Sequence, residues 1–86
     1  MTDIMQRPGK FLIDYNLLRR QPGVVLEIMK HMIIVSAQAS FMGRRIEYEA
    51  FSSLFGVTSE GGETPLYDIM INEYDGNTEI LAKKVE

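Results

Sequence analysis

The sequence predicts an α+β domain in which one or two N-terminal helices pack on a four-strand antiparallel meander sheet made of two consecutive hairpins. Three observations lead to this prediction. Apolar residues follow a helical spacing over residues 11–31, polar and apolar residues alternate from His31 onward, and an Asp-Gly pair at residues 75–76 separates two further alternating segments. Together these patterns place the helices before the strands.

The chain has the size of one domain. It contains 86 residues, of which 45% are apolar and 24% are charged, as in ordinary globular proteins. Residues 1–10 include Pro8-Gly9 and lack a regular apolar spacing. We therefore expect a flexible N-terminal arm over residues 1–10, followed by a single α+β domain over residues 11–86.

The two helices are predicted from apolar stripes. In FLIDYNLLRR, apolar residues at positions 11, 12, 15 and 18 suit a helix that ends at Gln21-Pro22-Gly23. A second stripe predicts a helix over about residues 22–31, with Pro22 tolerated in its first turn. One long helix over residues 22–41 is the alternative. The alternation after His31 favours a helix followed by a strand.

The first predicted hairpin joins residues 33–42 to residues 45–50. With Gly43-Arg44 as a type II′ loop, Phe41 pairs with Ile46 and Ala39 pairs with Tyr48. Ile46 and Tyr48 then face the core, while Glu47 and Glu49 share the polar face with Ser40 and Gln38.

The second predicted hairpin joins residues 67–74 to residues 78–85. Asp75-Gly76 suits a type I′ turn. This turn sets a register with four informative pairs, which are Ile71 with Ile80, Asp68 with Lys83, Met70 with Leu81, and Leu66 with Val85.

The residues that could be catalytic lack the neighbours that catalysis requires. Glu47 and Glu49 lie about 6.6–7 Å apart along a strand, but their predicted neighbours are polar, so we interpret them as part of a solvated face. The single histidine, His31, has no partners at a catalytic or metal-binding spacing, and Gly61-Gly62 lacks the context of a phosphate-binding loop. We expect no enzymatic activity, no catalytic residue, no cofactor and no metal.

Composition and the absence of certain motifs indicate the cellular compartment and the classes of partner. The chain has no cysteine, which favours a reducing compartment, and we expect a cytoplasmic protein. The apolar stretch at residues 24–35 is too short to span a membrane, and the N-terminus does not resemble a signal peptide. The net charge is −3, and no nucleic-acid-binding motif is present, so nucleic acid is not an expected partner.

One surface remains as a candidate for binding. On the second hairpin, Leu66, Met70, Leu81 and Val85 share the face that the first hairpin makes polar. Exposed apolar patches often mark partner surfaces. We therefore predict a small non-enzymatic protein-interaction module, such as a regulatory or virus-encoded inhibitor, that binds another protein of unknown identity and forms homo-oligomers, with a dimer favoured.

Two alternatives stay open. The apolar residues could be covered by Phe51, Leu54 and Phe55, in which case they form part of the core. The protein could also be a small-ligand or nucleotide-binding module, in which Arg44 and Arg45 contact an anion together with the loop at residues 59–64.

Overall fold

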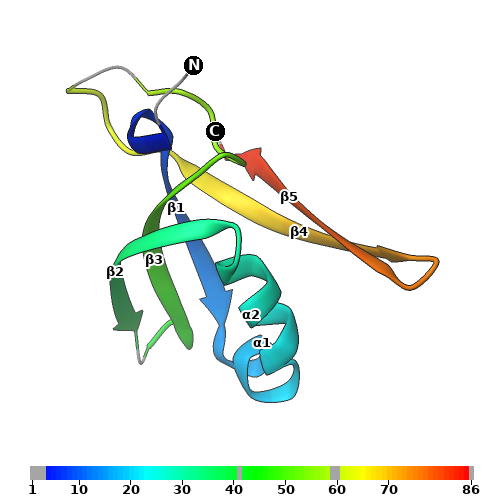
Figure 1. Ribbon diagram of the computed structural model, residues 1–86. Helices are drawn as coiled ribbons and strands as arrows, with labels where there is room; N and C mark the ends of the chain where they lie inside the picture. The colour runs from blue at the N-terminus through cyan, green and yellow to red at the C-terminus, as the bar shows by residue number, and fades with distance from the viewer. Residues whose placement is uncertain (1–3, 41, 59–60, 86) are drawn as a thin grey trace.

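The computed structural model of the chain describes residues 4–40, 42–58 and 61–85. Two helices pack on a five-strand mixed sheet with the strand order β2–β3–β1–β4–β5 (Figure 1). A short 3₁₀ turn, Ile4–Gln6, precedes the sheet. The elements are β1 (Pro8–Asp14), α1 (Tyr15–Arg20), α2 (Pro22–Met29), β2 (Met32–Ser40), β3 (Arg45–Ser52), β4 (Leu66–Tyr74) and β5 (Asn77–Lys84).

The α+β class is confirmed, but the four-strand antiparallel meander is wrong. The additional strand, β1, lies at the centre of the sheet, where it runs antiparallel to β3 and parallel to β4. It includes Pro8–Lys10, which we expected to belong to a flexible arm; residues 1–3 of that arm lie outside the described residues. Buried Gly9, Phe11 and Ile13 alternate with more exposed residues, which is the period of a strand.

The helical part of the chain begins later than predicted. Asp14 caps α1, because its carboxylate accepts a hydrogen bond of 2.7 Å from the backbone N–H of Asn16. The helix predicted over residues 11–20 is therefore limited to Tyr15–Arg20. α2 starts at Pro22 as predicted and is followed by strand β2, so one long helix over residues 22–41 is excluded.

The register of the first hairpin differs from the prediction by two residues. Ile46 pairs with Ala39 and Tyr48 pairs with Ala37, so the connection spans residues 41–44. Arg44, and not Gly43, has a positive φ, of 53°. The predicted two-residue turn is wrong, but from Ser36 to Ser40 the shift of two residues leaves every side chain on its predicted face, because the side-chain period of a strand is two. A bulge between Ile34 and Ser36 reverses the faces at the start of β2, so Ile34 pairs with Ala50 on the covered face and Ile33 with Phe51 on the open face.

The sheet has two unlike faces. We call the face that packs against α1 and α2 the covered face and the other the open face. The covered face supplies most of the core, in which Phe11 stacks on Tyr48 with ring centroids 5.3 Å apart. The buried apolar residues are Phe11, Ile13, Val25, Ile28, Ala50, Phe55, Tyr67 and Ile80. On the open face, no described side chain is buried.

The segment after β3 closes one end of the core. The ring of Phe55 stacks on Tyr67, with centroids 4.5 Å apart, and a Cβ atom on Gly9 would lie 2.6 Å from that ring. Buried Ser52 donates a hydrogen bond of 2.6 Å to the carbonyl of His31 and accepts one of 3.1 Å from the N–H of Leu54. These contacts hold the start of β2 against the end of β3.

Candidate interaction surface

The hairpin of β4 and β5 projects from the body of the protein (Figure 1). We call it the arm. β4 pairs with β1 only through Leu66 and Tyr67, whereas β4 and β5 pair with each other along their whole length. The radius of gyration of the Cα atoms is 13.2 Å, compared with about 12 Å for a compact domain of this length. The arm accounts for part of this extension.

The register of the arm is the predicted one. Ile71 pairs with Ile80, Asp68 with Lys83, and Met70 with Leu81. Asp75 and Gly76 have positive φ angles of 50° and 75°, as a type I′ turn requires. Because the turn fixes the register, it also fixes which side chains reach each face.

Four apolar side chains form two rows on the open face of the arm. We call them the stripe. Met70 lies opposite Leu81, and Leu66 accepts a backbone hydrogen bond of 2.8 Å from Val85. Met70 is 41% exposed, Val85 37% and Leu81 36%. Ile69, Ile71 and Ile80 point to the covered face, where they join the core cluster.

The sequence left open whether Phe51, Leu54 and Phe55 cover the stripe. Phe55 stacks on Tyr67 of the covered face, and Leu54 packs against the same core. Phe51 lies in β3, where it pairs with Pro8 and Ile33, and β1 separates this strand from β4. Met70, Leu81 and Val85 are exposed, so most of the stripe is open to solvent in the monomer.

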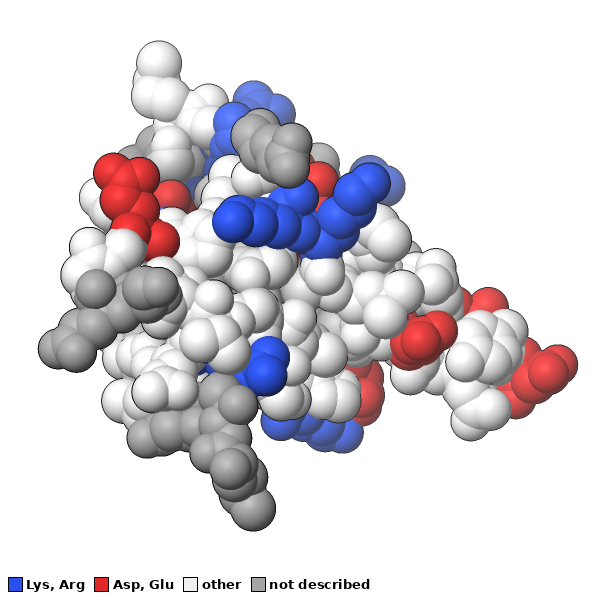
Figure 2. All heavy atoms as spheres, turned by 90° about the horizontal axis from the view of Figure 1, so that it is seen from above, with Lys and Arg blue, Asp and Glu red and all other residues white. Residues whose placement is uncertain are grey.

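Charged residues lie between the two rows of the stripe and at the tip of the arm. Asp68 and Lys83 form a row of opposite charge between the two apolar rows. Toward the turn, Glu73, Asp75 and Glu79 are exposed, with no Lys or Arg among residues 72–79. In Figure 2 the outer end of the projection carries carboxylates, whereas the lysines and arginines in view lie over the body. The tip of the arm is therefore acidic.

Arg44 and Arg45 lie at the other end of the molecule from the loop proposed to act with them. Arg44 is in the β2–β3 connection and Arg45 begins β3, while the loop follows the far end of that strand (Figure 1). At about 3.3 Å per residue, a strand of this length separates its ends by more than about 20 Å. Residues 59–60 of the loop lie outside the described residues. The structure does not bring residues 61–64 to the two arginines.

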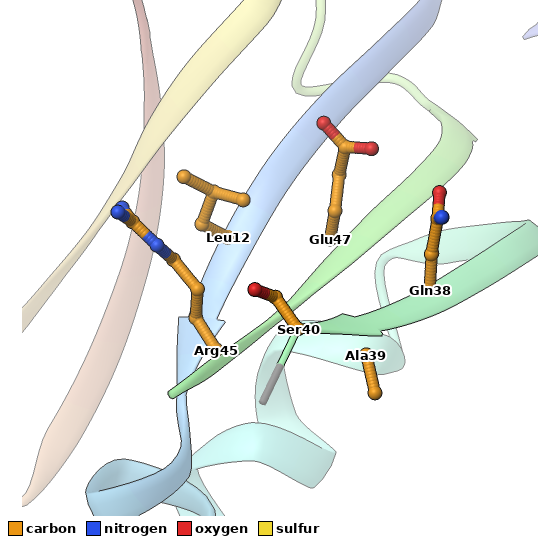
Figure 3. A pocket seen from close by; sticks show the side chains of 6 residues that line it. All are labelled: Leu12, Gln38, Ala39, Ser40, Arg45 and Glu47. Carbon is orange, nitrogen blue, oxygen red and sulfur yellow. The ribbon is translucent and has the colours of Figure 1, made fainter. Parts of the chain in front are cut away.

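A shallow hollow of about 350 Å³ adjoins Arg45 on the open face. Side chains from three strands stand around it on the same side of the sheet, and Ala39 points the other way (Figure 3). The lining contains one cation and one carboxylate, so its charge does not select an anion. The lining residues are Leu12, Gln38, Ala39, Ser40, Arg45 and Glu47.

The remaining sequence candidates lie apart from one another. Glu47 and Glu49 are half-buried on the open face, where Glu49 accepts a hydrogen bond of 3.5 Å from the Ser36 hydroxyl. His31 contributes its backbone carbonyl to Ser52. Within the described residues, no three His, Cys, Asp or Glu side chains gather closely enough to hold a metal ion.

The ion pair on α2 is a local surface feature. The ammonium of Lys30 lies 2.7 Å from the carboxylate of Glu27. The hydrogen bond to Lys30 and its charge lower the pKa of Glu27 below its ordinary value. Both side chains are exposed, so the pair has little bearing on stability or function.

Two features of the surface were not predicted. Leu12 is exposed on the open face because β1 is a strand, and the whole of β2 after Met32 is exposed at an edge of the sheet. The alternation of Gly9, Phe11 and Ile13 was the available signal for β1. The edge position of β2 had no local signal, because it depends on where β1 inserts.

Comparison with known proteins adds no identification. No family model matches the chain, and no curated protein or solved structure matches it. Among the described residues, neither helix has the length or the apolar content needed to cross a membrane. The surface of the protein is therefore the basis of the function proposed below.

Proposed function

We propose that this protein is a non-enzymatic interaction module that binds another protein through the stripe on the arm. The observation that carries the proposal is the uncovered apolar pair of Met70 and Leu81 on a projecting hairpin whose opposite face is already packed. A regulator or inhibitor that acts in the cytoplasm, by occupying a partner's surface, is the class of protein that this arrangement suits best.

The stripe has an apolar centre with polar and charged neighbours, an arrangement that protein interfaces share. Leu66 and Val85 flank the central pair, and the charged row of Asp68 and Lys83 separates the apolar rows. Interfaces draw most of their free energy from a few central side chains that are surrounded by polar contacts. Methionine also adapts its shape to a partner more readily than branched side chains do.

The charge of the arm indicates the chemistry of the partner. Glu73, Asp75 and Glu79 surround the tip, so the matching surface would be an apolar patch bordered by Lys and Arg. Complementary charge mainly accelerates association, and salt weakens it. We therefore expect the association rate of the complex to fall as ionic strength rises.

The test is capture of the partner from an extract of the native host with the double variant Met70→Lys/Leu81→Glu. Placing charges at the centre of the stripe should lower recovery of the partner at least about tenfold, as loss of a hot spot does. The matched control is Leu26→Lys/Val57→Glu, which places the same two charges on exposed apolar residues outside the arm. Equal recovery with the wild type and the double variant would refute the proposal.

Small-ligand binding is the weaker alternative, because Arg44 and Arg45 are remote from the loop that was to complete the site. A ligand held at the hollow would have to satisfy both Arg45 and Glu47. The geometry gives the interaction module more support.

A further inference from the structure

The two edges of the sheet are formed by β2 and β5. β2 is nine residues long, and every residue after Met32 is exposed. The outer side of an edge strand presents backbone N–H and C=O groups that no neighbouring strand satisfies, so it can pair with another chain. The free edge of β2 is thus a surface distinct from the stripe.

The two edges differ in how they are protected. β5 carries Glu79, Lys83 and Lys84, whereas β2 has no charged residue and no proline. Natural sheets protect edges against pairing by placing charges there, lysine above all. The protein therefore protects one edge chemically and leaves the other available.

The second half of β2 is regular enough to pair. A bulge lies between Ile34 and Ser36, but from Ser36 to Ser40 the register with β3 is unbroken. Ser36, Gln38 and Ser40 share the open face with Glu49, Glu47 and Arg45, their partners in β3. Ala37 and Ala39 occupy the other face beyond the cover of the helices and are exposed. Small side chains on both faces leave room for a neighbouring strand.

We propose that β2 pairs antiparallel with β2 of a second copy of the chain, about a two-fold axis at Gln38. This pairing sets Ser36 opposite Ser40 of the second copy, Ala37 opposite Ala39, and Gln38 opposite its equivalent. Polar residues meet polar ones and alanine meets alanine, and no like charges are brought together. The two sheets become continuous, and both open faces lie on the same side.

The exposed area supports a second copy as the occupant. The chain exposes 6295 Å², compared with about 5,200 Å² for a compact monomer of its mass. The excess, roughly 1,100 Å², is spread over the whole chain, including the arm, and is of the size that one partner buries in a standard interface, roughly 800 Å². An isologous dimer also closes on itself, so edge pairing would not continue into fibres.

A cysteine at position 38 tests the position of the axis. The chain has no cysteine of its own, so Gln38→Cys introduces a single thiol. Directly opposed residues of antiparallel strands have Cα atoms about 4.5–5.5 Å apart, which suits a disulfide. Mild oxidation should crosslink Gln38→Cys into a dimer, while Thr78→Cys on the other edge should stay largely monomeric. Equal crosslinking of the two variants would overturn the proposal.

Charge variants test the register in solution by light scattering. The wild type should have twice the mass of the 9.8 kDa chain. Ala37→Lys/Ala39→Lys sets lysine against lysine at two places and should weaken the dimer about tenfold. Ala37→Lys/Ala39→Glu sets opposite charges against each other and should restore it, which also shows that substitution at these positions leaves the fold intact.

The stripe serves as the control that separates this proposal from the proposed function. Met70→Lys/Leu81→Glu should leave the β2 dimer unchanged, even though it lowers capture of the partner. A monomeric wild type would overturn the β2 dimer. So would a dimer that Met70→Lys/Leu81→Glu dissociates and Ala37→Lys/Ala39→Lys does not.

Discussion

Ser52 is the residue whose environment most clearly links two elements. It is fully buried, and its hydroxyl joins the carbonyl of His31 to the N–H of Leu54. In Ser52→Ala the part-buried carbonyl and N–H both lose this partner, and such a loss costs about 1–3 kcal/mol. Ser53→Ala changes an exposed neighbour and should alter stability by less than about 0.5 kcal/mol. Urea denaturation of both variants checks this, and equal midpoints would contradict the role given to Ser52.

Other single residues were predicted from the sequence. Ile46 and Tyr48 lie on the covered face, and Glu47 and Glu49 occupy the opposite face, because alternation alone decides the face of a side chain. The cap formed by Asp14 was not predicted. An Asp just before Tyr15 is a typical helix N-cap. The apolar spacing of residues 11–18, however, predicted a helix that begins before Asp14.

Among the elements, the arm depends most on its turn. Gly76 has a φ of 75° and no heavy atom within 4 Å of the position of a Cβ atom, so only backbone conformation opposes a side chain there. Gly76→Ala should cost about 1 kcal/mol and speed amide hydrogen exchange in the outer half of β4 and β5. Gly23→Ala, in helix α2 and equally uncrowded, should be neutral or stabilising. Unchanged exchange in Gly76→Ala would contradict a type I′ turn that holds the register.

The arm and β1 show why one element was predicted and another was not. In the arm, the turn residues and the alternation agree, and both are local, so the register followed from the sequence. In β1, Leu12 interrupts the apolar alternation on the exposed side, and together with Phe11 it gives a spacing that also fits a helix. The segment is a strand because it lies between β3 and β4, where Phe11 and Ile13 on its covered face complete the core.

At the scale of the whole molecule, the order of the strands could not be read from local patterns. β1 pairs with residues about 40 and 55 positions later in the chain. Which distant strands pair with each other is not encoded in the local alternation of polar and apolar residues. The stripe could nevertheless be predicted, because it lies within one hairpin. Whether the stripe is covered depended on where Leu54 and Phe55 pack, which is a tertiary property.

On these proposals, the molecule has two separate surfaces for association. The stripe offers apolar side chains beside an acidic tip, and the edge of β2 offers backbone groups without charges. Pairing at β2 would place the open faces of two copies side by side. Each dimer would then hold two arms and bind two partner surfaces, which raises the effective affinity for a partner that is itself dimeric.

Methionine methyl NMR in an extract of the native host tests the central claim most directly. The chain contains six methionines; Met70 lies in the stripe, and Met42 is 98% exposed beside Arg44 and Arg45. With labelled methyl groups, and with the signal of Met70 assigned from a Met70→Leu variant, binding at the stripe should shift or broaden Met70 and leave Met42 sharp. A spectrum in which Met42 changes and Met70 does not would contradict the assignment of the stripe as the binding surface.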